Sequence, residues 1–113
     1  MIELKEIRDL AHEFAEQELR PHSKEWEQAG EIPRSVIGQL AELGLLGMLV
    51  PEEWDGLGLG TPAYLTALEE ITWGDTAVGV AMSVHNSIPT QMLLRYGTEE
   101  QKERWLKPLA RGE

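Results

Sequence analysis

The sequence predicts an all-α fold, a compact array of about five helices in which one long apolar helix is central. Its 113 residues suffice for a single domain. Apolar residues recur at steps of three and four along most of the chain, which is the period of a half-buried helix. Proline, glycine and capping residues separate these stretches, and no stretch indicates a strand.

Proline and glycine delimit the first two predicted helices. The opening stretch predicts a helix from about Ile2 to about Arg20, with charged residues on its outer face. Pro21 should interrupt this helix because proline lacks an amide donor. Pro33 suits the first turn of the second helix, which we expect to end at Gly44 as its C-terminal glycine.

A glycine-rich connection follows the second helix. Residues 44–60 contain several glycines and one proline, so we expect an ordered loop there. The glycines at 56, 58 and 60 invite comparison with a phosphate-binding loop. The preceding strand and the Gly-Lys-Ser/Thr step of nucleotide-binding motifs are both missing, so a turn-rich connection is the preferred interpretation.

The second half of the chain predicts three more helices. We expect Thr61 to be the N-cap of the third and Asp75 to cap the fourth. The fourth, residues 77–96, is apolar on every face, as in a helix surrounded by protein, and should bend at Pro89. Residues 98–101, Thr-Glu-Glu-Gln, match a capping box and begin the fifth helix.

The composition excludes several classes of partner. A net charge of −10, with the basic residues scattered, argues against nucleic acid and anionic membranes. Without cysteine there is no disulfide and no thiolate metal site. No apolar stretch approaches the roughly 20 residues of a membrane span, and the acidic, amphipathic opening is unlike a targeting signal. We therefore expect a soluble, cytoplasmic protein.

The titratable residues show no catalytic or metal-binding constellation. His12 and His22 are expected at the surface or at its rim, and neither lies in the Glu-x-x-His step of metal sites in helical bundles. His85 differs because it lies on the apolar fourth helix, where a hydrogen-bonded core histidine is the common outcome. The acidic residues of the glycine-rich loop are expected to be solvated: Glu52, Glu53 and Asp55.

Four segments carry a resemblance to a known family. They are the opening helix running into Leu19-Arg20-Pro21, LGLLGMLVPEEWDGLGL from Leu43, EEITWGDTAVGVAMSVH from Glu69 and YGTEEQKERWLKPLARGE from Tyr96. Together they resemble the N-terminal helical domain of the flavin-dependent acyl-CoA dehydrogenases over essentially the whole chain. One departure, Trp-Leu-Lys-Pro at 105–108 where the family has Tyr-Leu-Pro, leaves the expected fold unchanged.

The resemblance implies a part of an oxidoreductase of fatty acid metabolism. Enzymes of the family add a middle β-domain and a C-terminal helical domain, which hold most of the FAD. The C-terminal domain also supplies the glutamate that removes the substrate α-proton while the flavin takes a β-hydride. Since the chain stops at Glu113, we expect a domain-length fragment without a catalytic residue or bound cofactor of its own. The implied partners are an acyl-CoA and the remaining domains of the same enzyme, itself a homo-oligomer.

The resemblance also implies that this domain supplies one wall of the acyl pocket. The matching positions are Val80, Ala81, Val84, His85 and Ile88. Independently, the spacing of positions 81, 84, 85 and 88 puts them on one helix face. An aliphatic wall suits a fatty acyl chain because burying each methylene stabilises binding by about 0.8 kcal/mol. From periodicity alone, the same stripe could equally be core between helices.

A second hypothesis is a stand-alone helical interaction module without enzyme activity. Residues 78–94 carry more apolar surface than four short neighbouring helices can cover. Such a face would be covered equally by a partner protein, a second copy of the chain, another domain or an apolar ligand.

Overall fold

The computed structural model describes residues 3–113, so Ile2, the expected start of the first helix, lies outside it. The described residues form helices and no strand, which confirms the all-α prediction. The α-helices are α1 (Leu4–Phe14), α2 (Ser23–Ala29), α3 (Arg34–Glu42), α4 (Thr61–Gly74), α5 (Thr76–Ser87), α6 (Pro89–Tyr96), α7 (Glu99–Gln101) and α8 (Lys107–Arg111). Two π turns (Ala15–Leu19, Lys102–Leu106) and two 3₁₀ turns (Arg20–His22, Glu52–Trp54) complete the helical parts.

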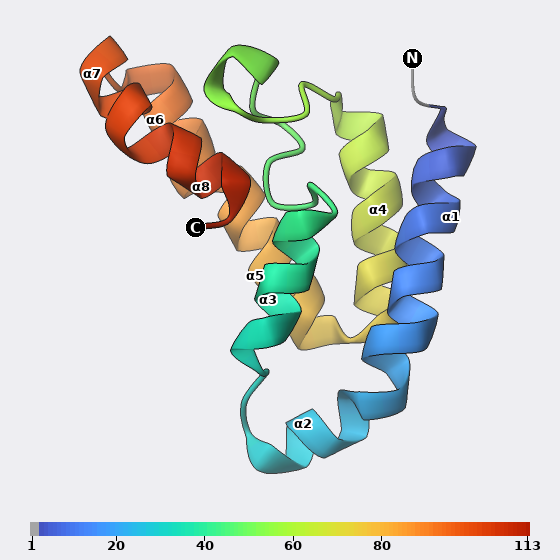
Figure 1. Cartoon of the computed structure of the whole chain (residues 1–113). Coiled ribbons are helices and arrows are strands. Elements are labelled where there is room, and N and C mark those ends of the chain that lie inside the picture. Colours follow the sequence, from blue (N-terminus) through green and yellow to red (C-terminus); the bar gives the residue numbers. More distant parts are fainter. Residues whose placement is uncertain (1–2) are drawn as a thin grey trace.

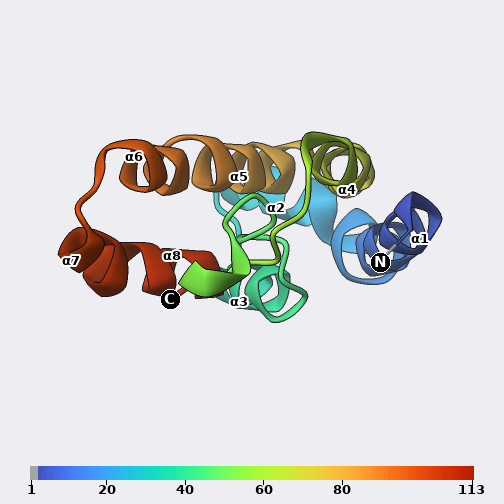
Figure 2. The same ribbon diagram turned by 90° about the horizontal axis from the view of Figure 1, so that it is seen from above.

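The helices form a flat array that measures 42 × 32 × 18 Å. Viewed from above, α4, α5 and α6 lie in one layer and α3 and α8 in the other, while α1 lies beside α4 (Figure 2). Within this array α1 packs along α4, and α4 packs against α5 (Figure 1). A slab this thin leaves most helices with one inner and one outer face.

The opening segment differs from the prediction. α1 ends at Phe14, yet the chain stays helical through Pro21 by way of a π turn and a 3₁₀ turn. A second π turn likewise comes just before Pro108. Because proline offers no amide to the turn before it, a wider turn is one way for the chain to continue as a helix. Pro21 therefore changes the type of helix and does not end it.

Two predicted helix boundaries are confirmed in atomic detail. Gly44 adopts φ = +79° directly after α3, and the Leu45 amide donates to the Leu40 carbonyl at 3.0 Å. This is the hydrogen bond of a glycine-terminated helix. At the start of α5, the Asp75 carboxylate accepts a hydrogen bond from the Val78 amide at 2.9 Å, so Asp75 is the N-cap that the sequence predicts.

A third boundary is confirmed, and two others differ by one residue. The capping box is present as predicted, with Thr98 and Gln101 bonded to each other's backbone amides. Thr61, however, is the first residue of α4, and the N-cap is Gly60, which has no side chain to accept a hydrogen bond. Pro33 lies just before α3 instead of inside its first turn.

The long fourth helix was predicted correctly in one respect and wrongly in another. It is interrupted at Ile88, directly before Pro89, where the sequence predicts a bend. It is not, however, surrounded by protein, because only its inner face, which includes Val78 and Met82, is buried. The apolar residues on its outer side stay exposed.

One buried amide joins α5 to the connection after α3. Asn86 is 1% exposed. Its Nδ2 donates to the carbonyls of Leu45 at 2.8 Å and Met82 at 2.9 Å, and its Oδ1 accepts from the Met48 amide at 3.2 Å. The side chain thus provides hydrogen-bond partners for two backbone groups of the irregular residues 44–50, which no helix or strand satisfies.

Polar and aromatic side chains join α1 to α4 at the edge of the array. His12 Nδ1 lies 2.8 Å from a Glu70 carboxylate oxygen, and Nε2 lies 3.1 Å from Glu16. The His12 ring stacks on Trp73 at 4.9 Å, and the Arg20 guanidinium lies 4.3 Å from the same indole. The hydrogen bond to Glu70 raises the pKa of His12 above its ordinary 6.5, because it favours the protonated ring.

Replacing Asn86 by Ala should lower the free energy of unfolding by about 2–4 kcal/mol, because it leaves the buried Met48 amide and the Leu45 carbonyl without a partner. Urea unfolding followed by circular dichroism measures this. Ser87→Ala is the control, since that exposed hydroxyl bonds only within its own helix, and should change stability by less than about 0.5 kcal/mol. Equal losses in the two variants would contradict the role of Asn86.

The raised pKa of His12 predicts a pH-dependent contribution to stability. A group whose pKa is higher in the folded state stabilises fully below its unfolded pKa, and the contribution disappears as the pH rises through the folded pKa. His12→Gln should therefore destabilise the protein more at about pH 5.5 than at about pH 8.5. Urea unfolding at both values tests this, and a loss that is independent of pH would contradict it.

Candidate functional site

An exposed apolar ridge runs along the outer side of α5 and α6. Its five residues recur every four positions, so they form one i, i+4 row on the helix surface. They are Val80, Val84, Ile88, Met92 and Tyr96, with exposed fractions of 57%, 46%, 53%, 58% and 79%. Core residues would not be exposed to this extent, so the ridge has no covering element among the described residues. We call these five residues the α5–α6 ridge.

The residues predicted for the acyl wall divide into two groups. Val80, Val84 and Ile88 belong to the α5–α6 ridge, whereas Ala81 and His85 are only partly exposed beside it. His85 is turned toward α8, where Nε2 donates a hydrogen bond to the Leu109 carbonyl at 2.6 Å. The ring is therefore bonded to the opposite layer, as expected for a structural histidine.

The predicted acyl wall left out the C-terminal end of this ridge. Met92 and Tyr96 continue the four-residue spacing that begins at Val80, so the same period could have identified them. The prediction stopped at Ile88 because the resemblance, and not the spacing, set its limits.

The division between α5 and α6 is held by a side chain. Pro89 cannot donate to the His85 carbonyl, which an unbroken helix would require. The buried Thr90 hydroxyl takes over, with distances of 3.1 Å to this carbonyl and 2.8 Å to that of Asn86. The Thr90 hydroxyl thus bridges the break, so that the outer residues of α5 and α6 keep a fixed orientation relative to each other.

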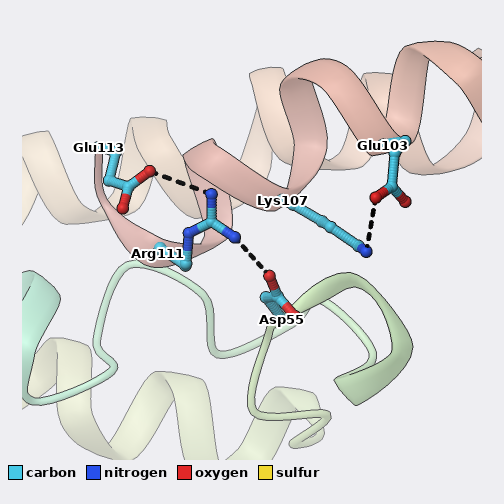
Figure 3. A network of polar contacts seen from close by, with 5 residues as sticks. All are labelled: Asp55, Glu103, Lys107, Arg111 and Glu113. Atoms are coloured by element: carbon cyan, nitrogen blue, oxygen red, sulfur yellow. Dashed lines mark hydrogen bonds and ion pairs between the residues drawn. The ribbon is translucent and has the colours of Figure 1, made fainter.

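The glycine-rich loop is fastened to the C-terminal helices. Asp55 is exposed, as expected, and its carboxylate accepts a hydrogen bond from Arg111 of α8 at 2.6 Å (Figure 3). Arg111 also donates to Glu113 at 3.1 Å, and Lys107 pairs with Glu103 at 2.9 Å. The hydrogen bonds that Arg111 donates to Glu113 and Asp55 raise the pKa of Arg111. Asp55 is therefore a structural anchor for the loop.

The same loop offers no cradle for a phosphate group. The amides of Leu57, Gly58 and Leu59 donate to carbonyls in residues 47–50 at 2.8–2.9 Å. Amides that are used inside the loop cannot also bind an anion, as the amides of a phosphate loop do. This confirms the turn-rich connection, and the amides of Leu57, Gly58 and Leu59 do not fit the diphosphate of FAD.

The remaining histidines stay at the surface. His12 is bonded to two glutamates, and His22 stacks on Trp26 and lies 3.8 Å from Glu25. In residues 3–113 no group of three His, Asp or Glu residues is arranged to hold a metal ion. Across that same range, no helix has the length and apolarity to cross a membrane.

Comparison with known proteins gives one consistent answer. Residues 2–113 match the family described as "Acyl-CoA dehydrogenase, N-terminal domain". The chain is 40% identical over 107 residues to a 3-(aryl)acrylate reductase of Clostridium sporogenes, and equally to the mitochondrial short-chain specific acyl-CoA dehydrogenase of Bos taurus. These alignments cover 95% of this chain but 28% and 26% of the two relatives.

Solved structures agree with the sequence comparison. Butyryl-CoA dehydrogenase from Megasphaera elsdenii superimposes with a TM-score of 0.91 at 30% identity, and glutaryl-CoA dehydrogenase from Mycobacterium smegmatis with 0.91 at 34%. The superpositions cover 99% of this chain and 30% and 29% of those chains. The chain therefore spans less than a third of the length of these relatives.

Proposed function

Because the chain belongs to the acyl-CoA dehydrogenase N-terminal domain family, we propose that it forms one wall of the acyl pocket in an enzyme that dehydrogenates acyl-CoA thioesters between the α and β carbons. A family match over nearly the whole chain favours this reading over a stand-alone interaction module. Since the chain spans only part of its relatives, the activity is proposed for the enzyme that contains this domain.

The observation that carries the proposal is the exposed α5–α6 ridge. Val80, Val84 and Ile88 present branched aliphatic side chains that nothing in the described structure covers. Covering them with an acyl chain removes apolar surface from water on both sides, at about 25 cal/mol per Å². Such contacts make no directional demand, which suits a flexible alkyl chain.

Ala81 and His85 have supporting roles in this proposal. Ala81 is small, so it leaves depth beside the ridge for the acyl chain. His85 keeps its place in the wall by donating to Leu109, and this bond orients the outer edge of the ring. The polar edge beside an aliphatic wall is compatible with short or modified acyl groups, in keeping with relatives named for short-chain acyl-CoA and butyryl-CoA.

FAD and the catalytic base are proposed to come from the other domains of the enzyme. FAD would supply the acceptor for the hydride, and no residue of this chain is assigned to it because the glycine-rich loop does not fit a diphosphate. The ridge spans 17 residues from Val80 to Tyr96, about 24 Å of helix between the first and the last. A short acyl chain covers a fraction of this length, so we propose that the remaining domains cover Met92 and Tyr96.

Assembly and location are part of the same proposal. We propose that the enzyme is a homo-oligomer formed mostly through its other domains. We also propose a cytoplasmic location, in contrast to the bovine relative, which is named mitochondrial.

The test is a bulky substitution on the ridge, made in the full protein that contains this domain. Val84→Trp should lower kcat/KM for butyryl-CoA about tenfold or more, because the indole occupies space meant for the acyl chain. Dye reduction that depends on the acyl-CoA measures the rate.

Leu65→Trp is the matched control, since Leu65 is an equally exposed apolar residue on α4, away from the ridge. It should leave kcat/KM within about twofold. If Val84→Trp and Leu65→Trp had the same effect, the ridge would not be the acyl wall. A full protein without any acyl-CoA-dependent activity would overturn the enzyme assignment itself.

A further inference from the structure

A pocket lies at the end of the array where α4 turns into α5, between α2 and the first residues of α5 (Figure 1). Its volume is about 610 Å³, within the roughly 300–1,000 Å³ of small-molecule sites. We call it the α2–α5 pocket. It reaches Ala77, about one helical turn before Val80, so it adjoins the α5–α6 ridge without including any of the five ridge residues. The proposed function makes no use of it.

Hydrogen bonds hold the walls of the α2–α5 pocket together. The Ser23 hydroxyl of α2 donates to the Asp75 carboxylate at 2.6 Å and so joins α2 to the start of α5. Directly after α2, Gly30 adopts φ = +77°, and its amide donates to the Trp26 carbonyl at 2.9 Å. This turn reverses the chain, so that the two residues after Gly30 form a third wall.

The apolar part of the pocket includes an aromatic ring. Trp26 and Ile32 line it and are partly exposed there, and Ala77 lines it from α5. The His22 ring stacks on Trp26 with 5.7 Å between the ring centroids, which restrains the indole. An indole face attracts cations electrostatically and also covers alkyl groups.

The polar part of the pocket is acidic. Glu27 and Glu31 line it at exposed positions, and Asp75 lines it although this residue is only 6% exposed. Asp75 accepts hydrogen bonds from Ser23 and Val78, and within residues 3–113 none of the three carboxylates forms an ion pair. A buried carboxylate usually has a cation nearby. Here the lining includes no lysine or arginine from the described part of the chain.

This combination selects for one class of ligand. Phosphates and carboxylates are disfavoured because they would meet like charges. A bound metal ion needs several side chains that converge on one point, and residues 3–113 contain no such group of His, Asp or Glu. An organic cation needs only nearby negative charge and a surface for its apolar body, and the pocket offers both.

We propose that the α2–α5 pocket binds a small organic cation, a protonated amine with an apolar body. The apolar body would lie against Trp26 and Ile32, and the ammonium group would lie beside Asp75. Glu27 and Glu31 at the mouth of the pocket would attract the cation, and added salt would weaken this attraction because both are exposed.

The proposal is tested by titrating the 113-residue chain with hexylamine at pH 7, where the amine is protonated, and recording amide and indole NMR spectra. The expected shifts saturate, and they cluster at residues 23–32, at residues 75–77 and at the Trp26 indole. Hexan-1-ol has the same alkyl body without the charge, and hexanoate has the opposite charge. Each should bind at least about fivefold more weakly.

Paired variants separate a specific site from general charge attraction. Glu27→Gln with Glu31→Gln should weaken hexylamine binding about threefold or more at low salt. Glu53→Gln with Glu100→Gln removes the same charge at exposed sites outside the pocket and should have little effect.

A second pair of variants tests the position of the site. Ala77→Arg brings a guanidinium to the wall of the pocket and should abolish binding, because it competes for the same carboxylates. Ala29→Arg adds the same charge at an exposed position of α2 that does not line the pocket, so binding should persist.

Four results would overturn the proposal. The first is the absence of saturable shifts with hexylamine, and the second is equal weakening by the two double glutamine variants. Shifts centred on Val84 and Ile88 would place the amine on the α5–α6 ridge. Tighter binding of acetyl-lysine amide than of hexylamine would make a lysine side chain of another polypeptide the occupant, in place of a small molecule.

Discussion

The orientation of α5 depends on the hydrogen bonds of one buried amide, that of Asn86. Two of its three hydrogen bonds fasten the inner face of α5 to residues 44–50, a stretch whose backbone has few helical partners of its own. Once the inner face is fixed, the opposite face must point outward, and Val80 and Val84 lie on it. The same amide therefore holds the irregular loop and sets the direction of the proposed acyl wall.

Three local signals were read correctly from the sequence, whereas contacts between distant residues were not predicted. Asp75, Gly44 and the capping box at Thr98 act within five residues, so their chemistry is visible in the sequence. The pairing of Asp55 with Arg111 joins residues 56 apart, and that of His12 with Glu70 residues 58 apart. No local pattern contains these contacts, so the sequence did not predict them.

The outer face of the fourth predicted helix shows a second limit of prediction from sequence. Its composition is that of a buried helix, and composition cannot say whether the cover comes from this chain or from elsewhere. The flat array, 18 Å in its shortest dimension, leaves α5 and α6 exposed on one side. An apolar surface that looked like core in the sequence is thus available to substrate and to other domains.

The central claim is that this domain supplies an apolar wall while flavin is held elsewhere in the enzyme. The most direct measurement is to incubate the purified 113-residue chain with excess FAD, remove free ligand by gel filtration, and record the flavin absorbance of the protein fraction. The account predicts a correctly folded helical protein that retains no flavin. Retention of one FAD per chain would contradict it, because this chain would then hold flavin by itself. The loop amides and exposed residues described above form no such site.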